Sequence, residues 1–227
     1  MSAPSRTHVV KSGESLSRIA AENGFGDIHT ILDHPNNASL KDSRPNPDVL
    51  FPGDEVFLPE REDKIEKADT GKLHLFSLSL PLVFLRLRPK DLDGKLLKKE
   101  AECLLSTGDP EDPVPLNPDG DGIIEREISA TLPEAELRVI AKNMKMDLLI
   151  GELDPVVTLS GQRARLNNLG YFAGFTRTDR KLFRWAAEEF KKDKAVSPLA
   201  VKEEDIDEVE GIKQKAFRDK LEKEHGS

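Results

Sequence analysis

The chain has 227 residues, enough for one large domain or two to three small ones. Hydrophobic residues make up 37% and charged residues 33%, and 34 basic against 42 acidic side chains leave a net charge of -8. This mixed composition excludes a wholly disordered chain, and the acidic excess excludes a protein that holds nucleic acid by neutralising phosphates. A single cysteine, Cys103, excludes an intramolecular disulfide and a multi-cysteine zinc site.

The sequence lacks two features that would place the protein in or across a membrane. The sequence has no run of 18 apolar residues, so it predicts no membrane-spanning helix. Residues 1–7 lack the apolar segment of a secretion signal. We therefore expect a protein that is made in the cytoplasm, with a disordered N-terminus over residues 1–6.

Residues 7–59 predict the order strand, helix, helix, strand. A β-branched run at 7–10 favours a strand, and Ser15 is a helix cap ahead of apolar residues spaced three and four apart. A second helix is expected between Asp27 and the His34-Pro35 step. A polar, proline-punctuated loop follows, and residues 54–59 predict the closing strand.

This segment resembles a LysM domain. The resemblance is carried by the runs HVVKSGESLSRIA (residues 8–20) and LFPGDEVFLP (residues 50–59), with an asparagine at 36 or 37 after the second helix. Both ends match in order and spacing, although the stretch 38–49 is longer than is usual in the family. The resemblance implies a βααβ fold that binds an N-acetylglucosamine-containing glycan such as peptidoglycan.

By the same resemblance, the glycan lies in a shallow groove with two exposed walls. One wall is the strand-to-helix turn, and the other is the loop before the closing strand. The residues implied are Ser12, Gly13, Glu14 and Ser15 on the first wall, and Asp48, Val49, Leu50, Phe51 and Pro52 on the second. The alternative is that Gly13, Pro52 and Gly53 only form turns.

Residues 60–72 are almost wholly charged and predict a solvated linker. In residues 73–155 apolar and polar residues alternate with a period of two, which indicates strands. The turns between them are rich in glycine, proline and aspartate. Such short strands are typical of a small antiparallel β-sandwich. The expected strands lie at residues 73–80, 83–88, 95–105, 123–128 and 136–141.

Residues 156–227 predict three helices. The first is capped at Ser160, the second starts at Thr178 or Asp179, and the last contains Val209 to Leu221 with an interruption at Gly211. The segment resembles the three-helix peptidoglycan-binding domain of bacterial wall hydrolases, through QRARLNNLGY (residues 162–171) and FRDKL (residues 217–221). The loop that shapes the glycan groove of that family is reduced here to residues 174–179.

No set of catalytic residues is evident, so we predict a protein that is not an enzyme. The run NPDGDGIIE (residues 117–125) resembles a calcium loop, but Ile128 stands where the bidentate carboxylate belongs, and a turn is favoured. The five histidines are scattered, and a serine-hydrolase elbow and a phosphate loop are missing. Cys103 and Trp185 are expected in the core. We expect no metal and no cofactor.

Taken together, the chain resembles the LysM-bearing proteins of type VI secretion and related contractile injection systems. The resemblance implies a non-catalytic peptidoglycan-binding accessory of the spike, baseplate or cargo, delivered to the periplasm or outside by the machine. A second hypothesis is a LysM fold reused as a protein–protein adaptor without glycan affinity, and a weaker one is a cell-wall hydrolase. The implied partners are peptidoglycan and a spike, baseplate or effector protein, with neither nucleic acid nor membrane.

Limited proteolysis tests the predicted boundary. We expect the first cut within residues 60–72, because an exposed, charged linker is opened by proteases before folded flanking segments. Mass spectrometry of the first fragments would locate the cut. A first cut inside residues 73–155 would contradict the boundary.

Overall fold

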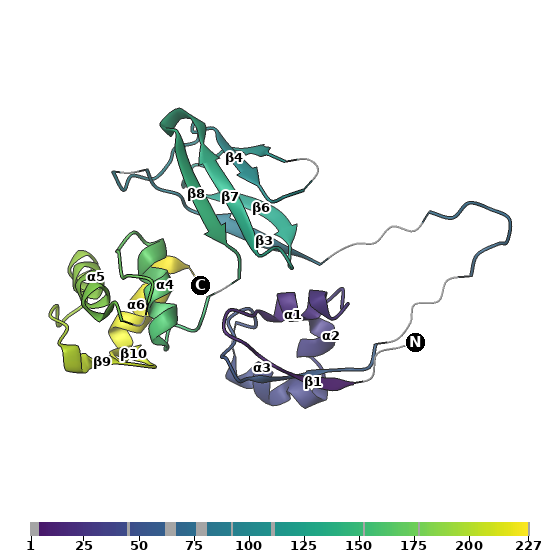
Figure 1. Cartoon of the computed structure of the whole chain (residues 1–227), viewed down its shortest axis with the longest axis horizontal. Coiled ribbons are helices and arrows are strands. Elements are labelled where there is room, and N and C mark those ends of the chain that lie inside the picture. Colours follow the sequence, from purple (N-terminus) through teal and green to yellow (C-terminus); the bar gives the residue numbers. More distant parts are fainter. Residues whose placement is uncertain are drawn as a thin grey trace. The chain divides into compact units, whose positions relative to one another are not determined.

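The computed structural model describes residues 5–44, 46–61, 67–75, 81–91, 93–109, 112–151, 153–176 and 178–226. Within these residues the fold is mixed α+β, with helices and small antiparallel sheets, which confirms the predicted α+β class (Figure 1). The chain divides into two compact units, Met1–Asp48 with Gly53–Glu152 and Val49–Pro52 with Leu153–Ser227. The three predicted domains stay a prediction. Residues 1–4 of the expected disordered terminus and 62–66 of the linker lie outside the described residues.

The N-terminal elements contain the expected strand–helix–helix–strand order with one addition. Strand β1 pairs antiparallel with β2, placing Thr7 opposite Phe57, and Ser15 caps α1 through a bond from the Arg18 N–H. The addition is helix α3, which occupies the stretch expected to be a polar loop and buries Leu40. The elements are β1 (Arg6–Val9), α1 (Leu16–Glu22), α2 (His29–Leu32), a 3-10 turn (Pro35–Asn37), α3 (Ala38–Ser43) and β2 (Glu55–Leu58).

One buried side chain, Asn37, joins these elements. Its Nδ2 donates to the carbonyls of Ile31 (2.7 Å) and Phe57 (2.8 Å), and its Oδ1 accepts the Phe57 N–H (2.8 Å). Asn37 is only 1% exposed, so these bonds satisfy backbone groups that water does not reach. The amide therefore holds β2 against the end of α2.

Two antiparallel sheets form the middle of the chain. Ile124 from the smaller sheet and Cys103, Leu105, Leu137 and Val139 from the larger one share a hydrophobic cluster. The predicted core position of Cys103 is thus confirmed. The smaller sheet pairs β3 (Leu82–Leu87) with β6 (Ile124–Ser129), and the larger has the order β5 (Val114–Leu116), β4 (Cys103–Ser106), β7 (Glu134–Val139) and β8 (Met144–Leu149).

The predicted strands of this segment differ from the observed ones in several places. The strand expected over 95–105 is shortened to β4, because residues 98–101 form a turn closed by a bond from Ala101 N to Lys98 O. Strand β5 was not predicted, because Pro115 belongs to it, which an edge strand tolerates. Strand β8 was missed because only one of its faces is half-buried. Residues 73–75 are exposed and outside any strand, and 76–80 lie outside the described residues.

The C-terminal unit contains three longer helices and a hairpin. Thr158, not the predicted Ser160, caps α4 by accepting the Gly161 N–H, whereas α5 starts after the predicted Asp179. Val209 does not belong to the last helix as predicted, because it lies in the turn of the hairpin. The elements are α4 (Leu159–Asn168), α5 (Arg180–Asp193), a 3-10 turn (Glu203–Asp205), β9 (Ile206–Asp207), β10 (Gly211–Ile212) and α6 (Lys215–His225).

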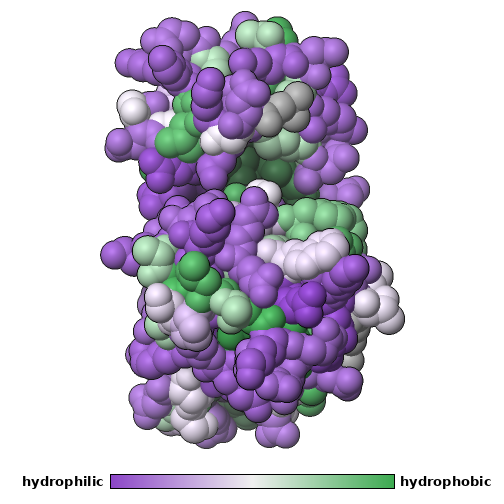
Figure 2. Space-filling view, turned by 90° about the vertical axis from the view of Figure 1, so that its left-hand side faces the viewer, coloured by the Kyte–Doolittle hydropathy of each residue, from purple (hydrophilic) through white to green (hydrophobic). Residues whose placement is uncertain are grey.

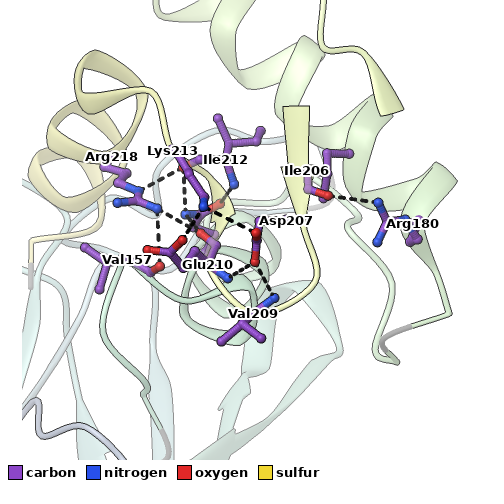
Figure 3. A network of polar contacts seen from close by, with 10 residues as sticks. Val157, Arg180, Ile206, Asp207, Val209, Glu210, Ile212, Lys213 and Arg218 are labelled. Atoms are coloured by element: carbon purple, nitrogen blue, oxygen red, sulfur yellow. Dashed lines mark hydrogen bonds and ion pairs between the residues drawn. The ribbon is translucent and has the colours of Figure 1, made fainter. Parts of the chain in front are cut away.

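The side chain of Asp207 stabilises the turn of the β9–β10 hairpin, and the fully buried Gln162 joins the hairpin to α4. Asp207 Oδ1 accepts the N–H groups of Val209 (2.8 Å) and Glu210 (2.9 Å) (Figure 3). Gln162 Nε2 donates to the carbonyls of Glu210 (3.0 Å) and Ile212 (3.1 Å), and its Oε1 accepts the Ile212 N–H (2.8 Å). The hairpin therefore occupies the beginning of the helix predicted from Val209, and α6 begins only at Lys215.

Arg218 adds a second connection from α6. Figure 3 shows its guanidinium directed at backbone carbonyls of the hairpin: Nε donates to Ile212 (2.8 Å) and Nη2 to Glu210 (2.9 Å). The helices themselves pack through Phe183, Phe190 and other buried apolar residues. Trp185 does not join this core as expected, since it is 48% exposed with the Lys181 ammonium 4.6 Å from its ring centre.

His225 lies at the end of α6 in an apolar, positively charged environment. Burial and the neighbouring Arg165 charge lower the pKa of His225 from 6.5 to about 4. Its Nε2 lies 3.0 Å from Nδ2 of Asn168, and its buried Nδ1 has no hydrogen-bond partner within the described part of the chain. The imidazole is therefore neutral in the folded protein near pH 7.

The surface view in Figure 2 shows a mostly hydrophilic face on which hydrophobic residues form small separate patches. No helix among the described residues is long and apolar enough to cross a bilayer.

Replacing Asn37 tests the first of these buried amides. We expect Asn37→Ala to lower the free energy of opening of residues 5–59 by about 2–4 kcal/mol, because three backbone groups lose their partner. Hydrogen-exchange mass spectrometry of the full chain measures this opening. The matched control is Asn36→Ala, whose side chain is exposed and should change the value by less than about 0.5 kcal/mol. Equal effects would refute the role of Asn37.

His225 predicts a pH dependence for the C-terminal unit. The unfolded chain takes up a proton near pH 6.5 and the folded chain only near 4, so stability is complete above 6.5 and falls as the pH approaches 4. Urea unfolding followed by Trp185 fluorescence should show a lower midpoint at about pH 5 than at about pH 7.5. His225 is the only histidine of residues 153–227, so His225→Leu should lose most of the difference. An unchanged difference would contradict the assignment.

Candidate functional site

The turn between β1 and α1 forms the first part of the candidate site. Gly13 has a φ of 81°, a left-handed conformation that glycine adopts without strain. The carboxylate of Glu14 folds back on the turn, where its Oε2 accepts the Lys11 N–H (2.8 Å) and lies 2.7 Å from His8 Nε2. Glu14 therefore braces the turn on the strand that precedes it.

Glu14 is charged in this position. Its partial burial raises the pKa of the carboxyl, but the Lys11 N–H and the His8 ring outweigh burial and hold the pKa below its ordinary value. One carboxylate oxygen takes both of these contacts. The turn thus presents a negative charge that is half-buried and fixed in place.

The loop that precedes β2 meets this turn at the start of α1. The carbonyl of Pro47 accepts the Leu16 N–H (3.2 Å), and the carboxylate of Asp48 accepts the Ser17 N–H (3.1 Å). These bonds satisfy N–H groups in the first turn of α1, which lack partners within the helix. Segments some 30 residues apart in sequence are thereby held side by side.

Further bonds fix the end of this loop. Gly53 N donates to Val10 O (2.8 Å), and Val10 N donates to Asp54 O (2.8 Å). Arg44 makes a bidentate ion pair with Asp54, in which Nε donates to Oδ2 and Nη2 to Oδ1, each at 2.7 Å. The site therefore rests on a rigid frame of backbone bonds and one ion pair.

The structure brings together part of the predicted site. Glu14, Ser15 and Asp48 meet around the start of α1, next to the Gly13 turn. Among the predicted residues, Ser12, Asp48 and Pro52 are exposed and Gly13, Glu14, Ser15, Val49 and Phe51 are half-buried. Val49–Pro52 belong to the second compact unit. Leu50 is 3% exposed, which corrects its prediction as an exposed wall residue: the apolar side chain is removed from water.

Sequence reasoning missed the supports of the site. Asp48 was assigned only to the groove wall, and its bond to Ser17 was not foreseen. The Arg44–Asp54 ion pair was also not predicted. The opposite charges at the two ends of this proline-containing loop were a signal from which it could have been predicted. The bond partners themselves depend on how the loop folds back.

Other candidate chemistry has a structural explanation. Asp119 Oδ1 accepts the N–H groups of Asp121 (2.9 Å) and Ile123 (2.8 Å), so the calcium-like run forms the predicted turn ahead of β6. Burial raises the pKa of the Cys103 thiol, which keeps it protonated. Within the described ranges no cluster of three or more His, Cys, Asp or Glu side chains is arranged to hold a metal ion.

Comparisons with protein-family models, with curated proteins and with solved structures found no match to this chain. The function is therefore argued from the residues and their geometry.

Proposed function

We propose that this protein is a non-catalytic accessory that binds peptidoglycan through its N-terminal segment, and that it serves the spike, baseplate or cargo of a bacterial contractile injection system. In this proposal residues 7–59 are a LysM domain, 73–155 a small antiparallel β-sandwich and 156–227 a three-helix peptidoglycan-binding-like domain. The injection machine is inferred from the sequence resemblance alone.

One observation carries the glycan proposal: the loop at Pro47 and Asp48 is hydrogen-bonded to the first turn of α1, which follows directly after the Gly13 turn in the chain. The LysM resemblance implies a site between these two segments, and they are 31 residues apart in the sequence at Ser17 and Asp48. The exposed residues there include Ser12 and Asp48, which have short polar side chains. Such groups suit the hydroxyl and N-acetyl groups of amino sugars, which need hydrogen bonds more than a deep pocket.

A shallow polar site of this kind binds weakly. We expect affinities between millimolar and micromolar, or about -4 to -8 kcal/mol. Insoluble peptidoglycan presents many copies of its repeat, so a sedimentation assay detects such binding through multiple contacts.

The second candidate is an adaptor that uses this fold to bind a protein instead of a glycan. A specific observation favours it: on β3, Leu82 is 57% and Phe84 66% exposed on one face of the strand. Leu73 and Leu75, a few residues upstream, are almost fully exposed. Exposed apolar side chains such as Leu82 and Phe84 on one strand face are found at protein interfaces. For a hydrolase, the weakest candidate, the described residues offer no supporting geometry.

Sedimentation of the full chain with insoluble peptidoglycan tests the glycan proposal. Ser12→Trp places a large ring in the exposed turn and should reduce the sedimented fraction at least tenfold without shifting the thermal midpoint. The matched control is Ser39→Trp, which adds the same ring to the exposed surface of α3 and should sediment like the wild type.

Each outcome decides between the candidates. The glycan site is supported if Ser12→Trp loses sedimentation with peptidoglycan and Ser39→Trp keeps it. A wild-type protein that does not sediment favours the adaptor. If both variants sediment like the wild type, the site lies elsewhere, and residues 156–227 are the segment to examine.

A further inference from the structure

The C-terminal unit contains an open hollow of about 720 Å³ that the glycan proposal does not use. It lies among the end of α5, the connector after α5, the hairpin and the start of α6. Its apolar lining includes Val201, Ile206 and Ile212, all of which are buried. Its volume is in the range of small-molecule sites.

A buried lysine, Lys191 of α5, lines this hollow. Only 3% of the residue is exposed, and the hydrogen bonds and ion pairs of the described residues do not include its ammonium. Burial lowers the pKa of Lys191, and the more distant charges of Asp205 and Glu188 only partly oppose this. The ammonium nitrogen keeps some accessible surface, so it is partly desolvated and not sealed in the core. A partly desolvated ammonium without a close partner would be stabilised by an anionic group in the hollow.

The rim of the hollow carries the opposite charge. Its carboxylates are Glu204, Asp205, Asp207 and Glu208, and its only other cation is Lys213. Figure 3 shows Lys213 already engaged, with its ammonium 3.3 Å from Asp207 and also paired with Glu210. Glu208 is the most available, because its side chain is 90% exposed and its contact with Arg180 is long, at 3.8 Å.

The hollow therefore combines the positive charge of a mostly buried lysine with an acidic rim and apolar side chains. A simple anion such as phosphate would meet the buried lysine but would be repelled by the rim. A simple cation would meet the rim but would be repelled by Lys191. A ligand with both charges on adjacent atoms and a short aliphatic group satisfies all three features.

We propose that this hollow binds a small zwitterion of the α-amino-acid type, with its carboxylate at Lys191 and its ammonium at the acidic rim. Its aliphatic side chain lies against Val201, Ile206 and Ile212. Lys191 then gains the charge-assisted hydrogen bond that the protein itself does not provide. The site is separate from the glycan proposal and does not depend on it.

Calorimetric titration of the full chain with valine and two derivatives tests the charge pattern. N-acetylvaline lacks the ammonium, and valinamide lacks the carboxylate. We expect valine to bind and both derivatives to bind at least tenfold more weakly. Absence of valine binding up to about 10 mM would overturn the proposal, as would N-acetylvaline or valinamide binding as well as valine.

A pair of neighbouring variants tests the lysine. Lys191→Met should abolish valine binding and keep or raise the thermal midpoint, because an apolar side chain of similar length replaces a buried charge. The control Lys192→Met removes an exposed charge next to it and should bind like the wild type. Unchanged binding by Lys191→Met would refute the assignment.

A second pair keeps the test valid if Lys191→Met does not fold. Glu208→Lys reverses a charge on the exposed rim and should weaken valine binding several-fold, whereas Glu189→Lys reverses an exposed charge that does not line the hollow. Equal affinities for the two would refute the role of the rim. Because the probes contain no sugar, failure here leaves peptidoglycan sedimentation unaffected, and the two proposals fail separately.

Discussion

The chain depends on one physical requirement: backbone N–H and C=O groups that folding buries must be hydrogen-bonded. Its helices and strands are short, so many of these groups lie in turns and at helix ends. The buried side-chain amides of Asn37 and Gln162 each bond several of these backbone groups. Each donates to backbone carbonyls and accepts one N–H, and some of these groups lie in segments distant in sequence. Each joins a short strand to a helix that could not hold it by apolar contact alone.

The candidate glycan site is built on the same principle. Asp48 and Pro47 supply acceptors to the first turn of α1, and Glu14 braces the preceding turn. Asp48 both supports the site and remains exposed, whereas Glu14 is half-buried. In the function proposed above, such a supported site would recognise a repeated polymer by many weak contacts.

The C-terminal hollow has the opposite character. There the protein leaves a requirement unmet, since Lys191 is buried without a close acceptor among the described residues. Neighbouring polar side chains have partners within the protein. Asp207 accepts two N–H groups and pairs with Lys213, and Arg218 donates to carbonyls of the hairpin. The unpaired ammonium of this mostly buried lysine, at the wall of the hollow, is the reason to expect a ligand there.

The sequence by itself determined the α+β class, the helix capped at Ser15, a helix start at Thr178 or Asp179 and the core position of Cys103, because these follow from local patterns of caps and apolar residues. Only the tertiary structure decided that Gly211 belongs to a hairpin. Its φ of 59° and its close approach to Gln162, where a Cβ would overlap the amide, depend on a helix some 50 residues away. Local propensity carries no information about such partners, and for the same reason the sequence could not foresee the exposure of Trp185, the burial of Leu50 or the isolation of Lys191.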